Sequence, residues 1–129
     1  MPDVLVEVRG NWLGDEKARF LDAIHSAMVE TIKIPHNDKV LRFHSYALDD
    51  FVIPPERGER FTRIEITMFA GRSLEAKRKL YRAIVRNLEP FGVPPTDVKI
   101  ALIEVPATNW GIRGGHAASD IDLGFEVRV

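Results

Sequence analysis

Apolar and polar residues alternate at the start of the chain and again in later stretches, a pattern typical of a strand with one buried face. Val4, Val6 and Val8 alternate with more polar neighbours, and similar patterns or β-type composition predict strands over 4–8, 40–48, 61–69, 100–105 and 123–129. The stretch 100–105 is apolar on both faces, which favours a central position in the sheet.

Two longer stretches have apolar residues at helical spacing instead. The first begins after Asp15, a candidate N-cap, and ends before Pro35; the second begins at Ser73, also a candidate N-cap, and ends before Pro94. Their apolar stripes are Phe20, Leu21, Ile24, Met28 and Ile32 in the first, and Leu80, Tyr81, Ile84 and Leu88 in the second.

The second half of the chain repeats the first. Each predicted helix is followed by Pro-x-x-Asp, at Pro35–Asp38 and at Pro94–Asp97, an offset of 59 residues. We therefore expect an α+β fold in one domain, residues 1–129, with repeat one at about 1–50, repeat two at about 60–106, and a C-terminal turn and strand at 107–129. Each β-α-β unit should pair its two strands in parallel, giving a four-stranded sheet with two helices on one face and a further C-terminal strand. The other sheet face needs a cover, which oligomerisation supplies most economically.

Composition narrows the functional classes. The 129 residues carry 18 basic and 19 acidic side chains, a net charge of −1 that gives no general attraction to nucleic acid or anionic membranes. There is no cysteine, so disulfides, zinc–thiolate sites and cysteine nucleophiles are excluded. No apolar run reaches the length of a membrane span, and the start of the chain lacks the basic residues of a signal peptide. We expect a soluble, cytoplasmic protein. The four histidines lack metal-ligand spacing, so no metal site is expected.

The ordered set of motifs resembles the tautomerase superfamily, and within it the malonate semialdehyde decarboxylase group. The matching residues are Pro2, 21–29, Pro35–Asp38, Arg72-Ser73, 101–104 and Asn109-Trp110, so the resemblance covers nearly the whole chain. It implies a homotrimer whose three sheets form a central barrel, and an active site around an N-terminal proline that works without a cofactor.

Pro2 is the first candidate catalytic residue. Removal of Met1 before a small residue would leave Pro2 with a free secondary amine, a general base when its pKa is lowered and a general acid when it is not. The alternative is a proline that only begins an edge strand.

Arg72 is the candidate carboxylate clamp, because its planar guanidinium lies just before a predicted helix N-terminus. The alternative is a solvated surface arginine. The decarboxylase pattern is Arg-x-Arg, whereas this chain has Ala70 at the first of these positions. A second cation would have to come from elsewhere, and Arg42, Arg63 and Arg113 are the candidates.

Asp38 and Trp110 complete the candidate site. The resemblance implies that Asp38 activates water or orients the substrate; the alternative is a turn residue, since Asp97 repeats the motif. Trp110 could form a pocket wall and donate its indole N–H, or it could simply pack over a loop.

Taken with the resemblance, these residues imply keto–enol tautomerisation of a small 2-oxo acid. Two alternatives stay open. One is a lyase that decarboxylates a 3-oxo acid or hydrates an unsaturated acid. The other is a non-catalytic ferredoxin-like domain that dimerises through its sheets and binds a small molecule.

Overall fold

A computed structural model describes residues 2–129. Its main sheet has the order β2-β1-β3-β4, with β1 at Asp3–Arg9, β2 at Leu41–Tyr46, β3 at Thr62–Phe69 and β4 at Val98–Val105. The pairs β1/β2 and β3/β4 are parallel, and the central pair β1/β3 is antiparallel. The two β-α-β units and their parallel strands are confirmed.

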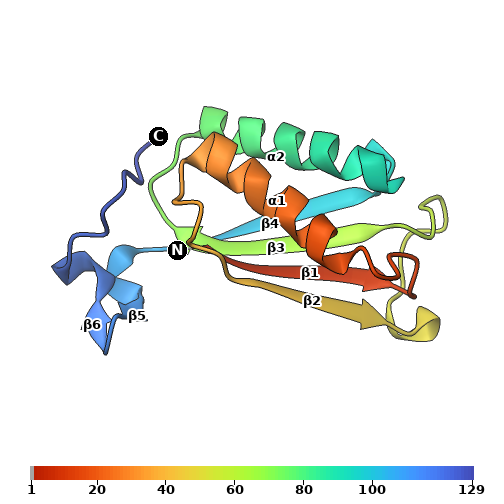
Figure 1. Cartoon of the computed structure of the whole chain (residues 1–129), viewed down its shortest axis with the longest axis horizontal. Helices are drawn as coiled ribbons and strands as arrows, with labels where there is room; N and C mark the ends of the chain where they lie inside the picture. Colours follow the sequence, from red (N-terminus) through yellow and green to blue (C-terminus); the bar gives the residue numbers. More distant parts are fainter. Residues whose placement is uncertain (1) are drawn as a thin grey trace.

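Both helices lie over the same face of the sheet (Figure 1). Helix α1 spans Lys17–Ile32 and α2 spans Leu74–Leu88. Their predicted apolar stripes enter the core: Phe20, Ile24, Ile32, Leu80, Ile84 and Leu88 are all fully buried. They pack against alternate sheet residues, among them Val4, Val6, Ile64, Ile66 and Met68. Burial at every second strand position is the alternation seen in the sequence.

The remaining regular elements are short. They are the 3₁₀ helices η1 (Leu48–Asp50), η2 (Glu89–Phe91), η3 (Pro95–Asp97), η4 (Ala107–Asn109) and η5 (Ala118–Asp120), and the strands β5 (Gly111–Ile112) and β6 (His116–Ala117). Strands β5 and β6 pair as a small hairpin beyond β4, close to the N-terminus in Figure 1.

One predicted helix cap is confirmed and the other is wrong. Ser73 precedes α2, and its hydroxyl accepts a hydrogen bond from the Ala76 N–H at 3.1 Å. At α1 the N-cap position belongs to Glu16 rather than Asp15, and no side chain caps it. The Glu16 N–H instead donates to the Leu13 carbonyl at 2.9 Å, so a turn occupies the residues where the cap was expected.

The prediction of a strand over 123–129 is wrong for this segment. The C-terminal strands are β5 and β6, and residues 123–129 belong to no strand. The side chains of this segment still alternate between half-buried and exposed, but its backbone pairs with no strand among residues 2–129. It is held instead at its end, where the Ser73 hydroxyl donates to the Val129 carbonyl at 2.8 Å.

The expectation that 100–105 forms a central strand is also wrong. Strand β4 lies at an edge, and its large apolar side chain Ile103 is 43% exposed. The apolar side chains on the second face of β4 are therefore left uncovered by the single chain.

The face of the sheet away from the helices carries a charged cluster in which Arg63 bonds Glu7 and Glu65 at 3.1 and 3.0 Å. Hydrogen bonds to Glu65 and Glu7 raise the pKa of the Arg63 guanidinium.

No helix among residues 2–129 is long and apolar enough to cross a membrane.

Candidate active site

Pro2 and Asp38 lie on neighbouring segments at one end of the sheet. Strands β1 and β2 are paired from Val4 opposite Leu41, and the Val4 N–H donates to the Val40 carbonyl at 3.0 Å. Pro2 is buried and comes two residues before this pair, whereas Asp38 comes three residues before Leu41 and is partly exposed. The parallel register of β1 and β2 therefore brings the start of the chain to the Pro-x-x-Asp turn.

The Pro-x-x-Asp motif closes the same turn in both repeats. The Asp38 N–H donates to the Pro35 carbonyl at 3.0 Å, and the Asp97 N–H donates to the Pro94 carbonyl at 2.9 Å. The two carboxylates differ in setting. Asp97 is buried, accepts from the Gly58 N–H at 3.0 Å and lines a different pocket of about 200 Å³. Asp38 is partly exposed and lines an open pocket of about 240 Å³. The turn is common to both repeats, but only the first places its aspartate at this pocket.

Arg72 is buried, with 5% of its surface exposed, so the alternative of a solvated surface arginine is wrong. Its guanidinium donates to the Phe69 and Ile32 carbonyls, each at 3.4 Å, and its Nε has no hydrogen-bond partner among the described residues. The Ile32 carbonyl is at the C-terminus of α1, where a cation is favoured. Burial lowers the pKa of Arg72, and the charge of Glu104 opposes that shift.

Trp110 packs beside the Arg72 segment. Its ring centroid lies 5.1 Å from that of Phe69, whose carbonyl accepts from Arg72. The indole N–H donates to the Val105 carbonyl at 3.1 Å. Because that donor is already used within the chain, the indole N–H is not available to donate to a ligand.

Arg113 is the arginine that shares the pocket of Asp38. It stands in the left-handed backbone region (φ 50°), and its guanidinium donates to the Asp122 and Leu123 carbonyls at 2.9 and 3.3 Å. Arg42 is at the same end of the sheet but does not line this pocket: its Nη2 lies 3.6 Å from a carboxylate oxygen of Asp3, the residue after Pro2. Arg63 belongs to the charged cluster on the open sheet face. The sequence did not show which of the three arginines shares the pocket of Asp38, because this depends on how the C-terminal segment folds back.

His25 holds the turn that carries Asp38, a contact that the sequence did not reveal. This buried side chain on α1 donates from Nε2 to the His36 carbonyl at 2.7 Å. Histidine at an apolar helix position is the only signal the sequence offered. Within residues 2–129, no group of three or more histidine or acidic side chains is placed to hold a metal ion.

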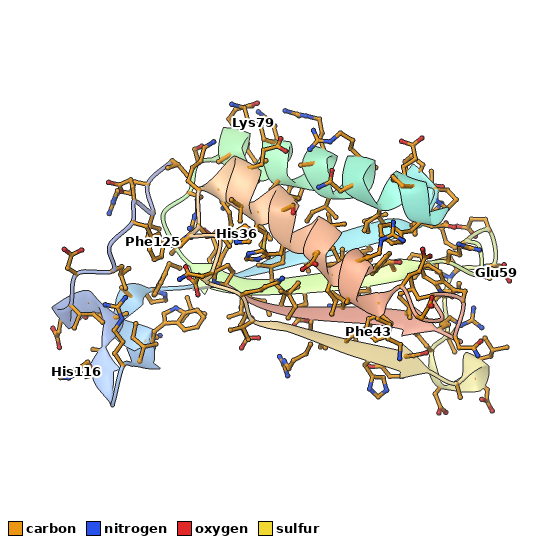
Figure 2. All side chains as sticks on the ribbon, viewed as in Figure 1. His36, Phe43, Glu59, Lys79, His116 and Phe125 are labelled. Carbon is orange, nitrogen blue, oxygen red and sulfur yellow. The ribbon has the colours of Figure 1, made fainter. Side chains whose placement is uncertain are left out.

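The candidate residues therefore gather at one end of the sheet, without all lining a single pocket. Asp38 and Arg113 line the pocket of about 240 Å³ together with Pro35, Asn37, Leu123 and Phe125, while Pro2, Arg72 and Trp110 are not among its lining residues. Figure 2 shows His36 and Phe125 at this end, near the start of the chain. The predicted removal of Met1 concerns a residue outside the described range 2–129.

Comparison with solved structures identifies the class of fold. The chain is similar to FG41 malonate semialdehyde decarboxylase inhibited by 3-bromopropiolate, with 26% identity and a TM-score of 0.81 over 89% of this chain and 92% of that one. It is also similar to a symmetric trimer of wild-type fused 4-OT, with 25% identity and a TM-score of 0.80 over 90% and 95% of the two chains. The fold is that of the tautomerase superfamily, as the resemblance implied.

Sequence comparison defines the family. The model of the tautomerase enzyme family matches residues 38–113, and the chain belongs to this family. The probable tautomerase YrdN of Bacillus subtilis (strain 168) is 26% identical over 105 residues, covering 77% of this chain and 81% of that protein. The 2-hydroxymuconate tautomerase of Comamonas testosteroni is 39% identical over 54 residues, 41% of this chain and 86% of that one. The expected resemblance, including the group of malonate semialdehyde decarboxylase, is confirmed, and the chain is an enzyme of the tautomerase superfamily.

Proposed function

We propose that this protein is a cofactor-independent tautomerase that interconverts the keto and enol forms of a small 2-oxo acid through the amine of Pro2. The observation that carries the proposal is the meeting of the Pro2, Asp38 and Arg72 segments at one end of the sheet. An amine base, a carboxylate and a buried cation are the groups that proton transfer on a carboxylate-bearing substrate requires.

The proposed reaction moves one proton and uses no redox chemistry. The neutral amine of processed Pro2 takes a proton from the carbon beside the carbonyl, and the electron pair of the broken C–H bond forms the enol double bond. The protonated amine then returns that proton to the carbonyl oxygen, which gives the enol and restores the neutral amine, and the reverse sequence gives the keto acid. Arg72 holds the substrate carboxylate, Asp38 orients the substrate or a water, and Trp110 forms a wall.

A second candidate, decarboxylation of a 3-oxo acid, is favoured by the similarity to FG41 malonate semialdehyde decarboxylase. That chemistry benefits from a protonated amine and from two cations that polarise the carbonyl. Ala70 stands where the decarboxylase pattern has its first arginine. Arg113 lies at the pocket of Asp38, but its guanidinium already donates to two backbone carbonyls. The site therefore has less positive charge than the decarboxylase pattern would give it, and this difference favours tautomerisation.

The test compares the two reactions on the same processed protein. We expect kcat/KM for phenylenolpyruvate to exceed kcat/KM for malonate semialdehyde, and the companion variant Ala70→Arg to narrow the difference. Faster decarboxylation by the unmodified protein would reject the tautomerase assignment in favour of the lyase.

Asp38 and Asp97 provide a matched pair of variants, because the same turn places one at the pocket and buries the other. Asp38→Ala should lower kcat by about a hundredfold or more, the scale of a lost proton-transfer or orienting group. Asp97→Ala should leave kcat unchanged and reduce the free energy of unfolding by about 1–3 kcal/mol, because the Gly58 N–H loses its partner. Denaturant unfolding and steady-state kinetics on both variants measure the contrast. Equal loss of kcat in the two variants would show that Asp38 acts only through the turn.

We further propose a homotrimer. The support is the sheet face away from both helices, together with an exposed edge strand and an unpaired C-terminal segment. A related structure, the fused 4-OT, is a symmetric trimer. Sedimentation equilibrium should give three times the chain mass of 14.6 kDa at micromolar concentration. A monomer would contradict this assembly, and a dimer would favour the ferredoxin-like alternative.

A further inference from the structure

A pocket of about 360 Å³ lies between the end of α1 and the outer side of α2. Figure 2 shows Lys79, one of its lining residues, on the side of α2 that faces away from the sheet. None of the candidate catalytic residues lines this pocket. Both helices cover one face of the sheet, whereas the proposed homotrimer covers the opposite face, so the pocket stays open to solvent in that assembly.

Most of the charged side chains that line this pocket are cations. They are Lys33, Lys79, Arg82 and Arg86, against the single carboxylate of Glu30. Four cations and one carboxylate give the lining a net charge of +3, whereas the whole chain has a net charge of −1. Positive charge is therefore concentrated at this pocket, and an anion is attracted to it more than to the rest of the surface.

A ligand can reach the donor groups of these cations. The side chains of Arg82 and Arg86 are 66% and 57% exposed. The guanidinium of Arg82 has one contact, from Nη2 to Glu75 Oε1, and that contact is long at 3.5 Å. Lys79 has neither a hydrogen bond nor an ion pair within residues 2–129. Most of their N–H groups are therefore available to an anion.

Glu30 holds the other two cations at the pocket. Its carboxylate accepts from Arg86 Nη2 at 2.8 Å, and its backbone carbonyl accepts from Lys33 Nζ at 2.7 Å. Glu30 thus positions two cations but neutralises the charge of only one of them.

The stability of α2 does not account for this cluster. Lys79, Arg82 and Arg86 are three and four residues apart, so they are neighbours on one side of the helix and repel one another. Only Arg86 lies in the last turn, where the helix dipole favours a cation. The arrangement is unfavourable for the helix alone, and a bound anion offsets the repulsion.

The row of cations on α2 is short. From Lys79 to Arg86 it spans about 10 Å at the helical rise per residue. Carboxylates lie beyond both of its ends, with Glu75 one turn before Lys79 and Glu89 directly after the helix. They repel a polyanion that continues along α2, such as a nucleic acid strand. With Lys33 facing the row from the end of α1, the site suits a small ligand with two adjacent phosphate groups.

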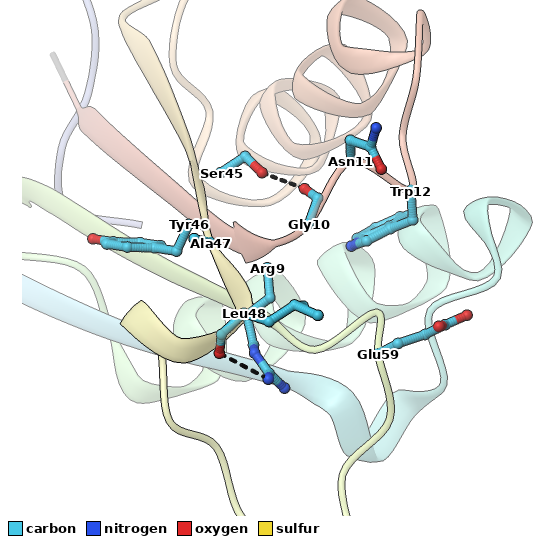
Figure 3. Close-up of a pocket in the computed structure, with 9 residues that line it drawn as sticks. All are labelled: Arg9, Gly10, Asn11, Trp12, Ser45, Tyr46, Ala47, Leu48 and Glu59. Carbon is cyan, nitrogen blue, oxygen red and sulfur yellow. Dashed lines mark hydrogen bonds between the residues drawn. The ribbon is translucent and has the colours of Figure 1, made fainter.

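A larger pocket at the ends of β1 and β2 does not share this property. It measures about 580 Å³, and Figure 3 shows Arg9, Tyr46 and Glu59 among its lining residues. Its one arginine and one glutamate have opposite charges, so its lining selects neither an anion nor a cation.

We propose that the pocket between α1 and α2 is a binding site for a small soluble molecule that carries two adjacent phosphate groups. Arg82 and Arg86 donate to phosphate oxygens through their guanidinium N–H groups, and Lys79 and Lys33 add positive charge from the two helices. The ligand is bound, and none of its bonds is made or broken.

Calorimetric titration of the processed protein with pyrophosphate tests this site. We expect one site per chain, and weaker binding as salt is added, because the cations are exposed. Orthophosphate should bind at least about tenfold more weakly than pyrophosphate, since it reaches fewer of the cations. Equal affinity for the two anions would overturn the proposal, as would the absence of pyrophosphate binding at millimolar concentration.

Arg82 and Arg78 provide matched variants for the same titration. Both are exposed arginines of α2 that contact Glu75 at 3.5 Å, but only Arg82 lines the pocket. Arg82→Met should raise the dissociation constant of pyrophosphate by about fivefold or more, and Arg78→Met, which changes the net charge equally, by less than about twofold. Equal effects of the two variants would show attraction to the whole helix and would overturn the proposal.

Arg72→Met separates this site from the proposed catalytic one. It should leave the dissociation constant of pyrophosphate unchanged, whereas Arg82→Met should leave kcat/KM for the 2-oxo acid unchanged. Loss of pyrophosphate binding in Arg72→Met would place the anion at the catalytic site and overturn the proposal. A single-stranded oligonucleotide that binds more tightly than pyrophosphate would overturn it in favour of a nucleic acid.

Discussion

Replacing Arg72 with methionine should lower kcat/KM for carboxylate-bearing oxo acids by about a hundredfold or more. The guanidinium is the buried cation at the proposed site, and truncating one member of a buried charge pair costs roughly 2–5 kcal/mol. Because the loss includes substrate binding, we expect a higher KM along with a lower kcat.

The same variant should change the free energy of unfolding by only about 1 kcal/mol or less. The two hydrogen bonds of Arg72 are long, at 3.4 Å, so each contributes little. Burial of the charge, which lowers the pKa of Arg72, is itself unfavourable, and the methionine variant is relieved of that cost. These two effects on the free energy of unfolding oppose each other. Binding of the substrate carboxylate has no such compensating gain, so the loss in kcat/KM stays large.

Two further variants make this result specific to the guanidinium of Arg72. Arg72→Lys keeps a charge but loses the planar fork, so its kcat/KM should fall between those of the unmodified protein and Arg72→Met. Arg82→Met removes an exposed arginine of α2 and should change neither kinetics nor stability measurably. Equal kcat/KM for Arg72→Met and the unmodified protein would reject the carboxylate clamp.

Pro2→Ala should retain part of the tautomerase activity. Processing of this variant would leave an alanine with a primary amine at the start of the chain, and that amine is also a base. We therefore expect kcat/KM to fall by less than about a hundredfold. Blocking the amine is more severe, because an amide nitrogen cannot accept a proton near neutral pH. A protein that retains Met1 should therefore lose the whole contribution of the base, about a hundredfold to ten-thousandfold.

The fold could be predicted from the sequence where local pattern and burial agree. Apolar alternation located β1 and β3, helical spacing located α1 and α2, and the repeated Pro-x-x-Asp motif indicated two similar units. Errors occurred where the environment of a segment depends on more than its own residues. Residues 123–129 alternate as a strand does but pair with no strand in the described part of the chain, and β4 is apolar on both faces although it lies at an edge.

The sequence predicted which residues belong to the candidate site, but not which contacts surround them. The sequence could not show that Arg72 is buried against the end of α1, or that the Trp110 indole N–H already donates to Val105. Nor could it select Arg113 as the arginine beside Asp38, since a folded-back C-terminal segment brings these residues together. Contacts between segments distant in the chain decided each of these points.

The most direct test of the central claim is the kcat/KM for phenylenolpyruvate of two preparations that differ only in Met1, each verified by intact mass. We expect full activity when Pro2 is the first residue and loss of at least about a hundredfold when Met1 precedes it, since only the first has a free amine. Equal kcat/KM in the two preparations would contradict catalysis by the N-terminal proline.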